Sequence, residues 1–496
     1  MKHCMTAAIL CALLLSAVSC GSAAGTEPAG SAGTEPVIAE TETEGPSIPE
    51  PDLPEMDFGG ADFTYLIHGE SAPSYKEEYV YAEKLDGEIV NDTIYNRNIQ
   101  IEEKFNIKIR IIDEAETANA AKKFVESQDA TVDVVDTQAN TLGPLATSGY
   151  LYDFNDLKYV NTAAEYWNPY AAQDLAVLGR LYFMPADISM RGLQSARFIY
   201  FNKKLIENYD LDDPYRMVQE NKWTLDKFLS YIPEITEDLN GDGIYDRNDL
   251  FGMLIEDGNS NGTFLHLLTG CGVQYTEADK DGRIVVTAMT EKTQDILTKI
   301  SDAIKDKDYT IEYNQLAKGA DISGFDHLYD WARSRFAAGQ FLFVQNGINE
   351  MRCFRDMTDD FGIVPNPKYD ASQENYYHKS DAFSPLFTIP VSVGNVDRAD
   401  AVLEYSAWLS HETLLPAYYE VTIKQKRVRD ETAVAMLDII RTSVRYEVSQ
   451  IYDIGISDAL WSAWQKGELA STFAKKEKSI NKSIEKLLTQ VEALDG

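Results

Sequence analysis

The chain has 496 residues, and its 80 acidic against 45 basic residues give a formal net charge of −35. Nucleic acids and anionic membrane surfaces bind clusters of Lys and Arg, so this acidic balance argues against both as electrostatic partners. The length exceeds what one hydrophobic core usually serves, which predicts two lobes.

Residues 1–19 have the pattern of an export signal: Lys2, an apolar run over 5–18 that is too short to cross a bilayer, and small residues before Cys20. The stretch Ala-Val-Ser-Cys at 17–20 resembles the lipobox of bacterial lipoproteins, in which the cysteine is lipidated and becomes the first residue. Acyl chains such as palmitate then hold the protein at the membrane. We predict an extracytoplasmic lipoprotein anchored through Cys20; plain secretion with an unmodified cysteine is the alternative.

Residues 20–55 have the composition of a tether, rich in Gly, Ser, Thr, Pro and acidic residues and without Lys, Arg or aromatic side chains. Such a segment cannot bury enough apolar surface to fold, and its prolines and like charges keep it extended. Of the later cysteines, Cys271 and Cys353 either pair or remain free thiols, and the sequence leaves both possibilities open.

From residue 56 the chain alternates strand and helix patterns. Strands are expected over 63–68, 107–111 and 132–136, with helices over 90–105 and 115–127 between them. This alternation predicts an α/β fold with a parallel sheet, whose ligand sites lie beyond the carboxyl ends of the strands. Gln138, Asn140 and Thr141 follow the third strand and are therefore candidates for the rim of a binding site.

Further strands are expected over 180–184, 196–201, 250–255, 341–344, 361–364 and 387–393, and further helices over 224–232, 290–303, 398–409, 431–444 and 475–493. Five segments in chain order carry a family resemblance. They are the strand and helix over 133–152, Gly-Arg-Leu-Tyr-Phe-Met-Pro at 179–185, Trp-Thr-Leu-Asp-Lys-Phe at 223–228, Phe-Ala-Ala-Gly-Gln-Phe-Leu-Phe at 336–343, and the region 414–429. Together they resemble family 1 extracellular solute-binding proteins, the group that includes maltose-binding proteins.

The resemblance implies a two-lobed periplasmic-binding-protein type II fold, with hinge strands between the lobes and the ligand in the interlobe cleft. By this analogy lobe one comprises residues 56–188 plus 346–412, and lobe two comprises 189–345 plus 413–496. It also implies closure of the hinge around a solute and delivery of that solute to the permease subunits of an ABC importer. We expect a monomer that binds and is not an enzyme.

The segment 238–249 has the spacing of a calcium-binding loop. Its oxygen donors fall at positions 1, 3, 5, 7, 9 and 12, which are Asp238, Asn240, Asp242, the Ile244 carbonyl, Asp246 and Asp249. Gly243 occupies position six, where such loops turn sharply. We predict a structural Ca²⁺ ion here; the alternative is an ordinary polar turn, since Asp, Asn and Gly favour turns anyway.

A second motif, Gly258-Asn259-Ser260-Asn261-Gly262, matches the nucleophile-elbow pattern of serine hydrolases. Two charged residues precede it where an elbow strand is apolar, and no oxyanion-loop motif is present. We interpret the segment as a polar loop in which Asn259 and Asn261 offer amides to a ligand. A lipid-anchored hydrolase that uses Ser260 remains the alternative from another functional class.

Sugar recognition needs flat aromatic faces and amide or carboxylate groups. Besides the amides already named, the candidates for lining the cleft are Trp167, Tyr170, Asn346, Asn349, Tyr377 and Phe383. Each aromatic side chain has core packing as its alternative role. The resemblance to the maltose-binding group, more than these residues, implies a binder of a carbohydrate or oligosaccharide, with a peptide or another non-sugar solute as the alternative ligand.

Overall fold

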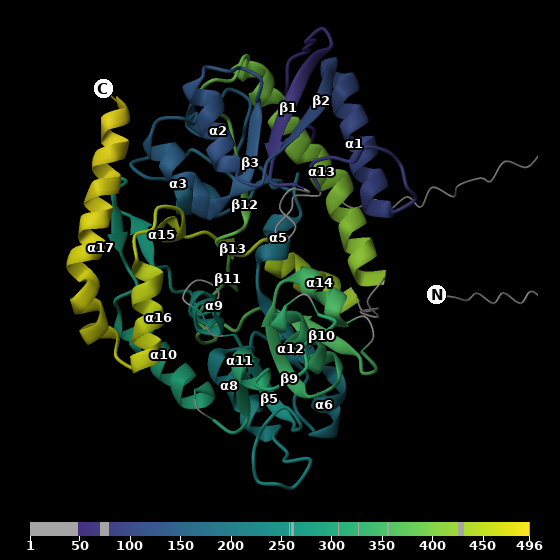
Figure 1. The fold of residues 1–496 in the computed structure, drawn as a ribbon, viewed down its shortest axis with the longest axis vertical. Coiled ribbons are helices and arrows are strands. Elements are labelled where there is room, and N and C mark those ends of the chain that lie inside the picture. Colours follow the sequence, from purple (N-terminus) through teal and green to yellow (C-terminus); the bar gives the residue numbers. More distant parts are fainter. Residues whose placement is uncertain are drawn as a thin grey trace, which may run out of the picture. The chain divides into compact units, whose positions relative to one another are not determined.

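The structure is a computed structural model, and it describes residues 48–69, 79–256, 258, 262–305, 307–325, 327–354, 357–424 and 431–495. Residues from Ile48 onward form one compact unit, which is drawn in Figure 1. The predictions for Cys20, Asn259, Ser260 and Asn261, and for the tether up to residue 47, fall outside the described residues. The tether prediction is wrong for residues 48–55, which belong to the folded unit: the Ile48 amide donates to Glu412 at 3.1 Å, and the Trp408 indole donates to the Ile48 carbonyl at 3.0 Å. Among the residues that are described, no helix has the length and apolarity needed to cross a membrane.

The first lobe is built on a four-stranded sheet with the order β12-β3-β1-β2. Its strands are β1 (Ala61–Ile67), β2 (Ile107–Asp113), β3 (Val134–Gln138) and β12 (Pro385–Thr388). The first three strands are parallel and β12 is antiparallel to β3. The crossover helices are α1 (Ile89–Phe105), α2 (Thr117–Glu126) and α3 (Ala139–Thr147). The βαβ alternation expected from the sequence is confirmed here.

The second lobe is built on a five-stranded sheet with the order β10-β4-β9-β5-β8. Its strands are β4 (Phe198–Asn202), β5 (Phe251–Ile255), β8 (Thr310–Glu312), β9 (Phe341–Asn346) and β10 (Phe361–Val364). β5, β8 and β9 are parallel, and β4 is antiparallel to both β9 and β10. All residues of β9 are buried, because helices cover both faces of the sheet.

The remaining elements cover these sheets or connect them. The short helices before residue 240 are α4 (Ala171–Leu175), α5 (Arg191–Ser195), α6 (Lys203–Asn208), α7 (Pro214–Gln219) and α8 (Leu225–Tyr231), with η1 (Phe154–Asp156) and η2 (Ile232–Glu234). The next are α9 (Thr263–Gly270), α10 (Glu291–Ile304), α11 (Tyr313–Leu316), α12 (Leu328–Ala337) and η3 (Ile348–Phe354). The C-terminal part holds α13 (Val396–Lys424), α14 (Glu431–Arg441), α15 (Val448–Ile451), α16 (Ile456–Lys466), α17 (Leu469–Glu492) and η4 (Ala493–Asp495).

Two small ribbons complete the fold. β6 (Thr276–Ala278) pairs with β7 (Ile284–Val286), and β11 (His378–Lys379) pairs with β13 (Val444–Arg445). In the sequence, β11 follows β10 of the second sheet and precedes β12 of the first sheet. The ribbon of β11 and β13 therefore lies on a segment that connects the two lobes.

The carboxyl ends of the parallel strands in the two sheets face each other. The chain leaves the first sheet at Met184, which pairs with Phe387 antiparallel to β12 and therefore runs toward the carboxyl edge. It continues through α5 into β4, whose first residue pairs with Asn346 at the carboxyl end of β9. A second connection runs from β11 into β12, which also begins at the carboxyl edge of the first sheet. Both connections therefore link one carboxyl edge to the other.

Three expectations need correction. Residues 180–184 form isolated bridges at Arg180 and Met184 and no strand, because only single residues of the segment pair with neighbouring backbone. β10 hydrogen-bonds to β4 in the second sheet, so the assignment of 346–412 to lobe one begins too early. The C-terminal segment 413–496 does not belong to lobe two alone, since α15 and α17 pack against α3 of the first lobe as well.

Candidate functional site

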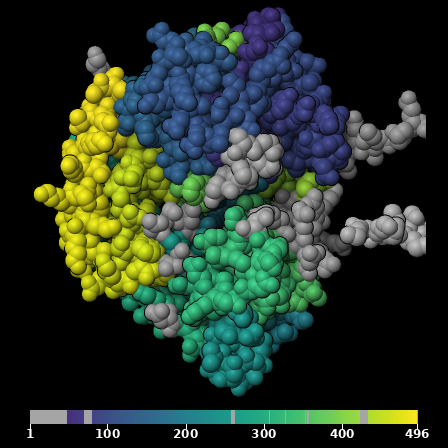
Figure 2. Space-filling view, in the orientation of Figure 1, coloured from purple at the N-terminus to yellow at the C-terminus, as the bar shows by residue number. Residues whose placement is uncertain are grey.

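Polar side chains lie where the two carboxyl edges face each other, in the interlobe region. Figure 2 shows the surface of the same view, with the purple and blue residues of the first lobe above the teal and green residues of the second. On the first lobe, Gln138 ends β3 and its Nε2 lies 3.1 Å from Nε2 of His68, which follows β1. The second ring nitrogen of His68 lies 3.3 Å from the Thr117 hydroxyl. Partial burial and the charge of Arg191 lower the pKa of His68, so a neutral imidazole is favoured at this edge.

An amide and two tyrosines meet on the connection between the lobes. Gln194, on α5, donates from Nε2 to the hydroxyl of Tyr79 and, at 3.2 Å, to the hydroxyl of Tyr418 on α13. The two tyrosine rings lie edge to face, with centroids 5.9 Å apart and an interplanar angle of 88°. We call Tyr79, Gln194 and Tyr418 the tyrosine–amide cluster. It combines aromatic rings with hydroxyl and amide groups, as carbohydrate sites require; Tyr79 is half-buried, and Gln194 and Tyr418 are each 8% exposed.

Arg97 fixes this cluster from behind. The buried guanidinium on α1 donates to the carbonyl oxygens of Tyr79 (3.0 Å), Val80 (2.7 Å) and Ile188 (3.1 Å). It also donates to the hydroxyl of Ser410 on α13 at 3.1 Å. One side chain therefore ties together the segment that holds Tyr79, the connection that leads to Gln194, and the helix that carries Tyr418.

On the second lobe, three neighbouring parallel strands end in polar side chains. Glu256 follows β5, Asn346 ends β9 on one side of it, and Tyr313 follows β8 on the other. Glu256 forms a two-point ion pair with Arg197, which precedes β4, with N–O distances of 2.5 and 3.2 Å. Burial disfavours the charge on Arg197, but Glu256 and Asp381 outweigh this and raise its pKa.

One of these side chains carries a buried polar atom without a hydrogen-bond partner. Asn346 is 3% exposed and its Nδ2 has no bonded neighbour, whereas the hydroxyl of Tyr313, which is 2% exposed, lies beside the Arg333 guanidinium. Oδ1 of Asn346 accepts from the Gly347 amide at 2.9 Å, so its amide group is oriented. Unsatisfied buried polar atoms are uncommon and mark places where water or a ligand completes the bonding.

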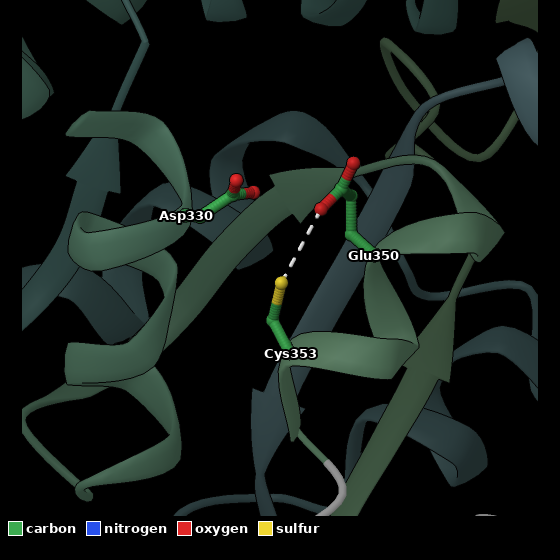
Figure 3. A group of neighbouring side chains, drawn as sticks. All are labelled: Asp330, Glu350 and Cys353. Carbon is green, nitrogen blue, oxygen red and sulfur yellow. Dashed lines mark hydrogen bonds between the residues drawn. The ribbon is translucent and has the colours of Figure 1, made fainter. Parts of the chain in front are cut away.

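A third cluster, drawn in Figure 3, brings Asp330, Glu350 and Cys353 together. Their donor atoms lie within 4.8 Å of one another, which is close enough for a metal site. Arg333 argues against a bound cation, because its Nη1 lies 2.8 Å from Glu350 and 3.4 Å from Asp330. The guanidinium already neutralises the carboxylates that a cation would need, so we interpret this cluster as an ion-pair network.

Several of the cleft residues predicted from the sequence lie near the interlobe region. Asn140 begins α3 with its backbone N–H bonded to Ala382, and the Thr141 hydroxyl donates to the Gln138 carbonyl at 2.7 Å. Asn349 lies in η3 beside Gly347, with its Oδ1 3.1 Å from where a Cβ on that glycine would stand. Half-buried Phe383 donates its N–H to Asp381 in the connection between the lobes.

The other aromatic candidates are held by partners of the protein itself. Trp167 is 1% exposed and donates from Nε1 to Glu404 at 2.9 Å, so most of its ring packs inside the first lobe; it also borders a hollow lined by Pro185 and Leu193. Tyr170 and Tyr377 lie edge to face at 5.8 Å, and the Arg445 guanidinium lies over both rings at 4.5 and 5.3 Å. The arginine thus occupies one face of each ring.

The calcium-type loop folds around its own carboxylates. Asp238 accepts from the amides of Gly241 and Gly243, both at 2.7 Å, and buried Asp249 accepts from Leu239 and Asp246 at 3.0 and 2.8 Å. Gly243 has φ +74°, the left-handed turn that position six of such a loop requires. The donor set is all oxygen, which fits a hard cation. Among the described residues, however, only Asp330, Glu350 and Cys353 bring three acidic, His or Cys donor atoms within 4.8 Å. The Ca²⁺ site therefore stays a prediction.

Two of the candidate histidines, His266 and His378, are buried within the protein. The His266 ring on α9 is fully buried with both nitrogens unpartnered, and burial lowers its pKa well below the usual range. His378 lies 3.1 Å from the Asn366 amide and 2.8 Å from the Ser443 hydroxyl. The turn after β5 is closed by Thr263, whose hydroxyl accepts from the Glu256 amide.

Sequence reasoning missed the tyrosine–amide cluster, Arg197 with Glu256, and Tyr313. Tyr79 and Gln194 are 115 residues apart, and Gln194 and Tyr418 are 224 apart, so no local pattern links them. The only available signal was position, since Glu256 and Tyr313 directly follow strands whose carboxyl ends build the site.

Comparison with solved structures found similar chains. A cyclo/maltodextrin-binding protein in complex with maltotetraose aligns with TM-score 0.52 and 14% identity, over 87% of this chain and 97% of its own. A substrate-binding protein of Listeria monocytogenes in complex with cycloalternan aligns with TM-score 0.48 and 14% identity, over 87% and 99%. The apo form of RafE from Streptococcus pneumoniae aligns with TM-score 0.49 and 14% identity, over 87% and 98%.

At these identities the likeness to the first structure shows the two-lobed fold and no more. A comparison with curated proteins found no match. The family model for bacterial extracellular solute-binding proteins matches residues 100–421, which is more than half of the chain. The protein is therefore a member of the bacterial extracellular solute-binding protein family.

Proposed function

We propose that the protein binds a carbohydrate outside the cytoplasmic membrane and delivers it unchanged to an ABC importer. The observation that carries the proposal is the tyrosine–amide cluster on the connection between the two lobes. It offers aromatic edges, two hydroxyl groups and an amide at the place where two carboxyl edges meet. The maltotetraose complex of a protein with the same fold supports this ligand class.

Opening and closing of the two lobes explain how one site both captures a solute and releases it. The connections through α5 and between β11 and β12 are short, so a change in their backbone angles moves one sheet edge toward the other. A solute that contacts both edges stabilises the closed form by its differential affinity for the two states. The permease then recognises the closed form. No bond in the solute is made or broken.

The test is a thermal-shift screen of neutral oligosaccharides, followed by calorimetry with the best ligand. A bound ligand raises the free energy of unfolding by about 2.7 kcal/mol at a hundredfold excess over Kd, and the melting temperature rises with it. Replacing Gln194 by Ala should weaken binding at least about tenfold, since it removes a donor that holds two tyrosines. Tyr150→Ala, which removes a surface tyrosine bonded to Glu126, is the matched control and should leave affinity unchanged.

The outcomes separate the candidate functions. Binding of an oligosaccharide without any product supports the proposal. Selective binding of peptides would show that the ligand is not a sugar but another solute bound by the same fold. Hydrolysis of an ester substrate that disappears in Ser260→Ala would replace binding by catalysis altogether.

The attachment of the protein to the membrane is also proposed, from the sequence at 17–20. A lipid on Cys20 should place the protein in the detergent phase when cell extracts are partitioned. Cys20→Ala should move it to the aqueous phase, with unchanged ligand affinity because Cys20 precedes the folded unit, which begins at Ile48. An unchanged partition would leave plain secretion as the explanation.

A further inference from the structure

A chain of hydrogen bonds at the carboxyl edge of the first sheet fixes where the proton of His68 lies. The Thr117 hydroxyl donates its only proton to the Glu114 carbonyl, at 2.7 Å. It must therefore accept at its contact with Nδ1 of His68, 3.3 Å away, so Nδ1 carries a proton. The Ala115 carbonyl also favours a proton on this ring. In a neutral imidazole the other nitrogen, Nε2, is then an acceptor.

This proton assignment orients the amide of Gln138. Its Nε2 lies 3.1 Å from Nε2 of His68 and can donate to the unprotonated ring nitrogen. The amide oxygen Oε1 then lies on the other branch of the side chain, and within the described part of the chain no group bonds to it. Gln138 ends β3 and is partly exposed, so Oε1 is available as an acceptor in the interlobe region.

Protonation of His68 would reverse this amide. An imidazolium donates from both nitrogens, so Nε2 could no longer accept from Gln138. The amide would have to turn and present Oε1 to the ring, which leaves its NH₂ group for a ligand. One proton on His68 therefore changes Gln138 from an acceptor into a donor.

The surroundings of the ring favour the neutral form at neutral pH. Partial burial and the charge of Arg191 on α5 lower the pKa of His68 from its ordinary value of 6.5. Asp113 at the end of β2 and Glu116 before α2 act in the opposite direction but do not outweigh them. One oxygen of Asp113 is also engaged by the Gly69 amide, at 3.0 Å. The neutral ring is thus the form that is present when a ligand arrives.

We propose that His68 is a positioning residue for ligand binding, which holds the Gln138 amide so that Oε1 accepts a hydrogen bond from a hydroxyl group of the solute. The identity of this solute as a sugar rests on the proposed function. His68 needs no contact with the ligand, because it acts through Gln138. Its tautomer decides which of the two amide groups the ligand meets.

The first test is nitrogen-15 NMR of the ligand-free protein with labelled histidine, in which His68→Gln assigns the signal. The chemical shifts should show a protonated Nδ1 and an unprotonated Nε2 at neutral pH. A ring that carries its proton on Nε2, or that is cationic at this pH, would overturn the proposal. This measurement is independent of the identity of the solute.

The second test follows the affinity for an oligosaccharide from the screen between about pH 7.5 and about pH 5. Affinity should fall at least about threefold over this range, because binding favours the unprotonated ring. In His68→Gln an amide oxygen can replace Nε2 as the acceptor at every pH. This variant should bind within about twofold of the wild type at neutral pH and should lose the pH dependence.

Two further variants separate orientation from folding. His68→Leu offers no acceptor to Gln138 and should bind at least about threefold more weakly at neutral pH, with its thermal melt preserved. His327→Gln removes an exposed histidine just before α12 and should keep the wild-type pH profile. Wild-type affinity in His68→Leu, or a pH dependence that survives in His68→Gln, would contradict the role of His68.

The two tests distinguish this proposal from the proposed function. If a peptide or another solute binds in place of a sugar, the proposed function fails, and the same pH series with that solute decides the role of His68. If an oligosaccharide binds with the same affinity at both pH values, the proposed function stands and the positioning role fails.

Discussion

Gly347 and Gln194 lie so close that a Cβ on the glycine would stand 2.2 Å from the Gln194 carbonyl oxygen. The first follows β9 of the second lobe and the second lies on α5, in the connection between the lobes. This contact sets the distance between the end of β9 and the tyrosine–amide cluster. Only a residue without a side chain permits it.

Gly347→Ala should therefore weaken ligand binding and lower the melting temperature. The added methyl group forces α5 away from β9, and overpacking of this kind costs about 1–3 kcal/mol. Calorimetry and thermal unfolding measure the two effects. Gly394→Ala is the control, because its Cβ would lie in ordinary contact, 3.4 Å from Ala130. Wild-type behaviour of the Gly347 variant would show that the contact has no role in the site.

Arg97→Met should destabilise the protein by at least about 3 kcal/mol, since the carbonyls of Tyr79, Val80 and Ile188 each lose a buried donor. Unfolding by denaturant measures this change. Arg110→Met removes an arginine whose pair with Asp62 is exposed and should cost no more than about 1 kcal/mol. A similar cost in both variants would contradict the anchoring role of Arg97.

Stability should depend on pH through Glu447. Burial, with a contribution from Asp174, raises the pKa of this carboxyl from 4.5 to about 8. The folded state thus holds a proton that the unfolded state has released between these values, so this contribution to stability is present below pH 4.5 and is lost as pH rises toward 8. Buried Lys379, with a pKa lowered from 10.5 to about 8, is charged in both states over most of this window.

The measurement is the free energy of unfolding of the wild type minus that of Glu447→Gln, determined at several pH values. The difference should fall as pH rises from about 5 to 8, because glutamine does not titrate while other groups contribute equally to both proteins. A difference that stays flat, or that rises with pH, would show that Glu447 is ionised in the folded protein.

Calcium should raise the melting temperature, and EDTA should reverse the effect. Asp242→Asn keeps the acceptor for the Ile244 amide, which now lies 2.8 Å from Oδ1, but it removes one charge from the donor set. The variant should melt like the wild type without calcium and gain much less from its addition, because the loop hydrogen bonds survive and the cation affinity does not. Melting curves with and without calcium are sufficient. No response of the wild type would leave the loop as a polar turn.

Local patterns in the sequence were enough for the βα alternation of the first lobe and for most strands of the second. Side-chain periodicity reports which faces are buried, and burial within a strand or helix depends on near neighbours. The segment 180–184 shows the limit, because its apolar residues suit a strand but the sheet offers Met184 only a single bridge. Trp167 shows a second limit of sequence patterns. An indole suits a sugar cleft and a core equally, and its environment here depends on Glu404, which is distant in the sequence.

The chain by itself determined the two-lobed class, the polar ends of β3 and β9, and the oxygen spacing of the loop over 238–249, since each depends on residues close in sequence. Only the tertiary structure decided that Gln194 meets Tyr79 and Tyr418, and that Glu256 stands between Asn346 and Tyr313. Such groups come together because strand order and crossover connections bring separate parts of the chain to one edge, and no local hydrogen bond or periodicity encodes that order.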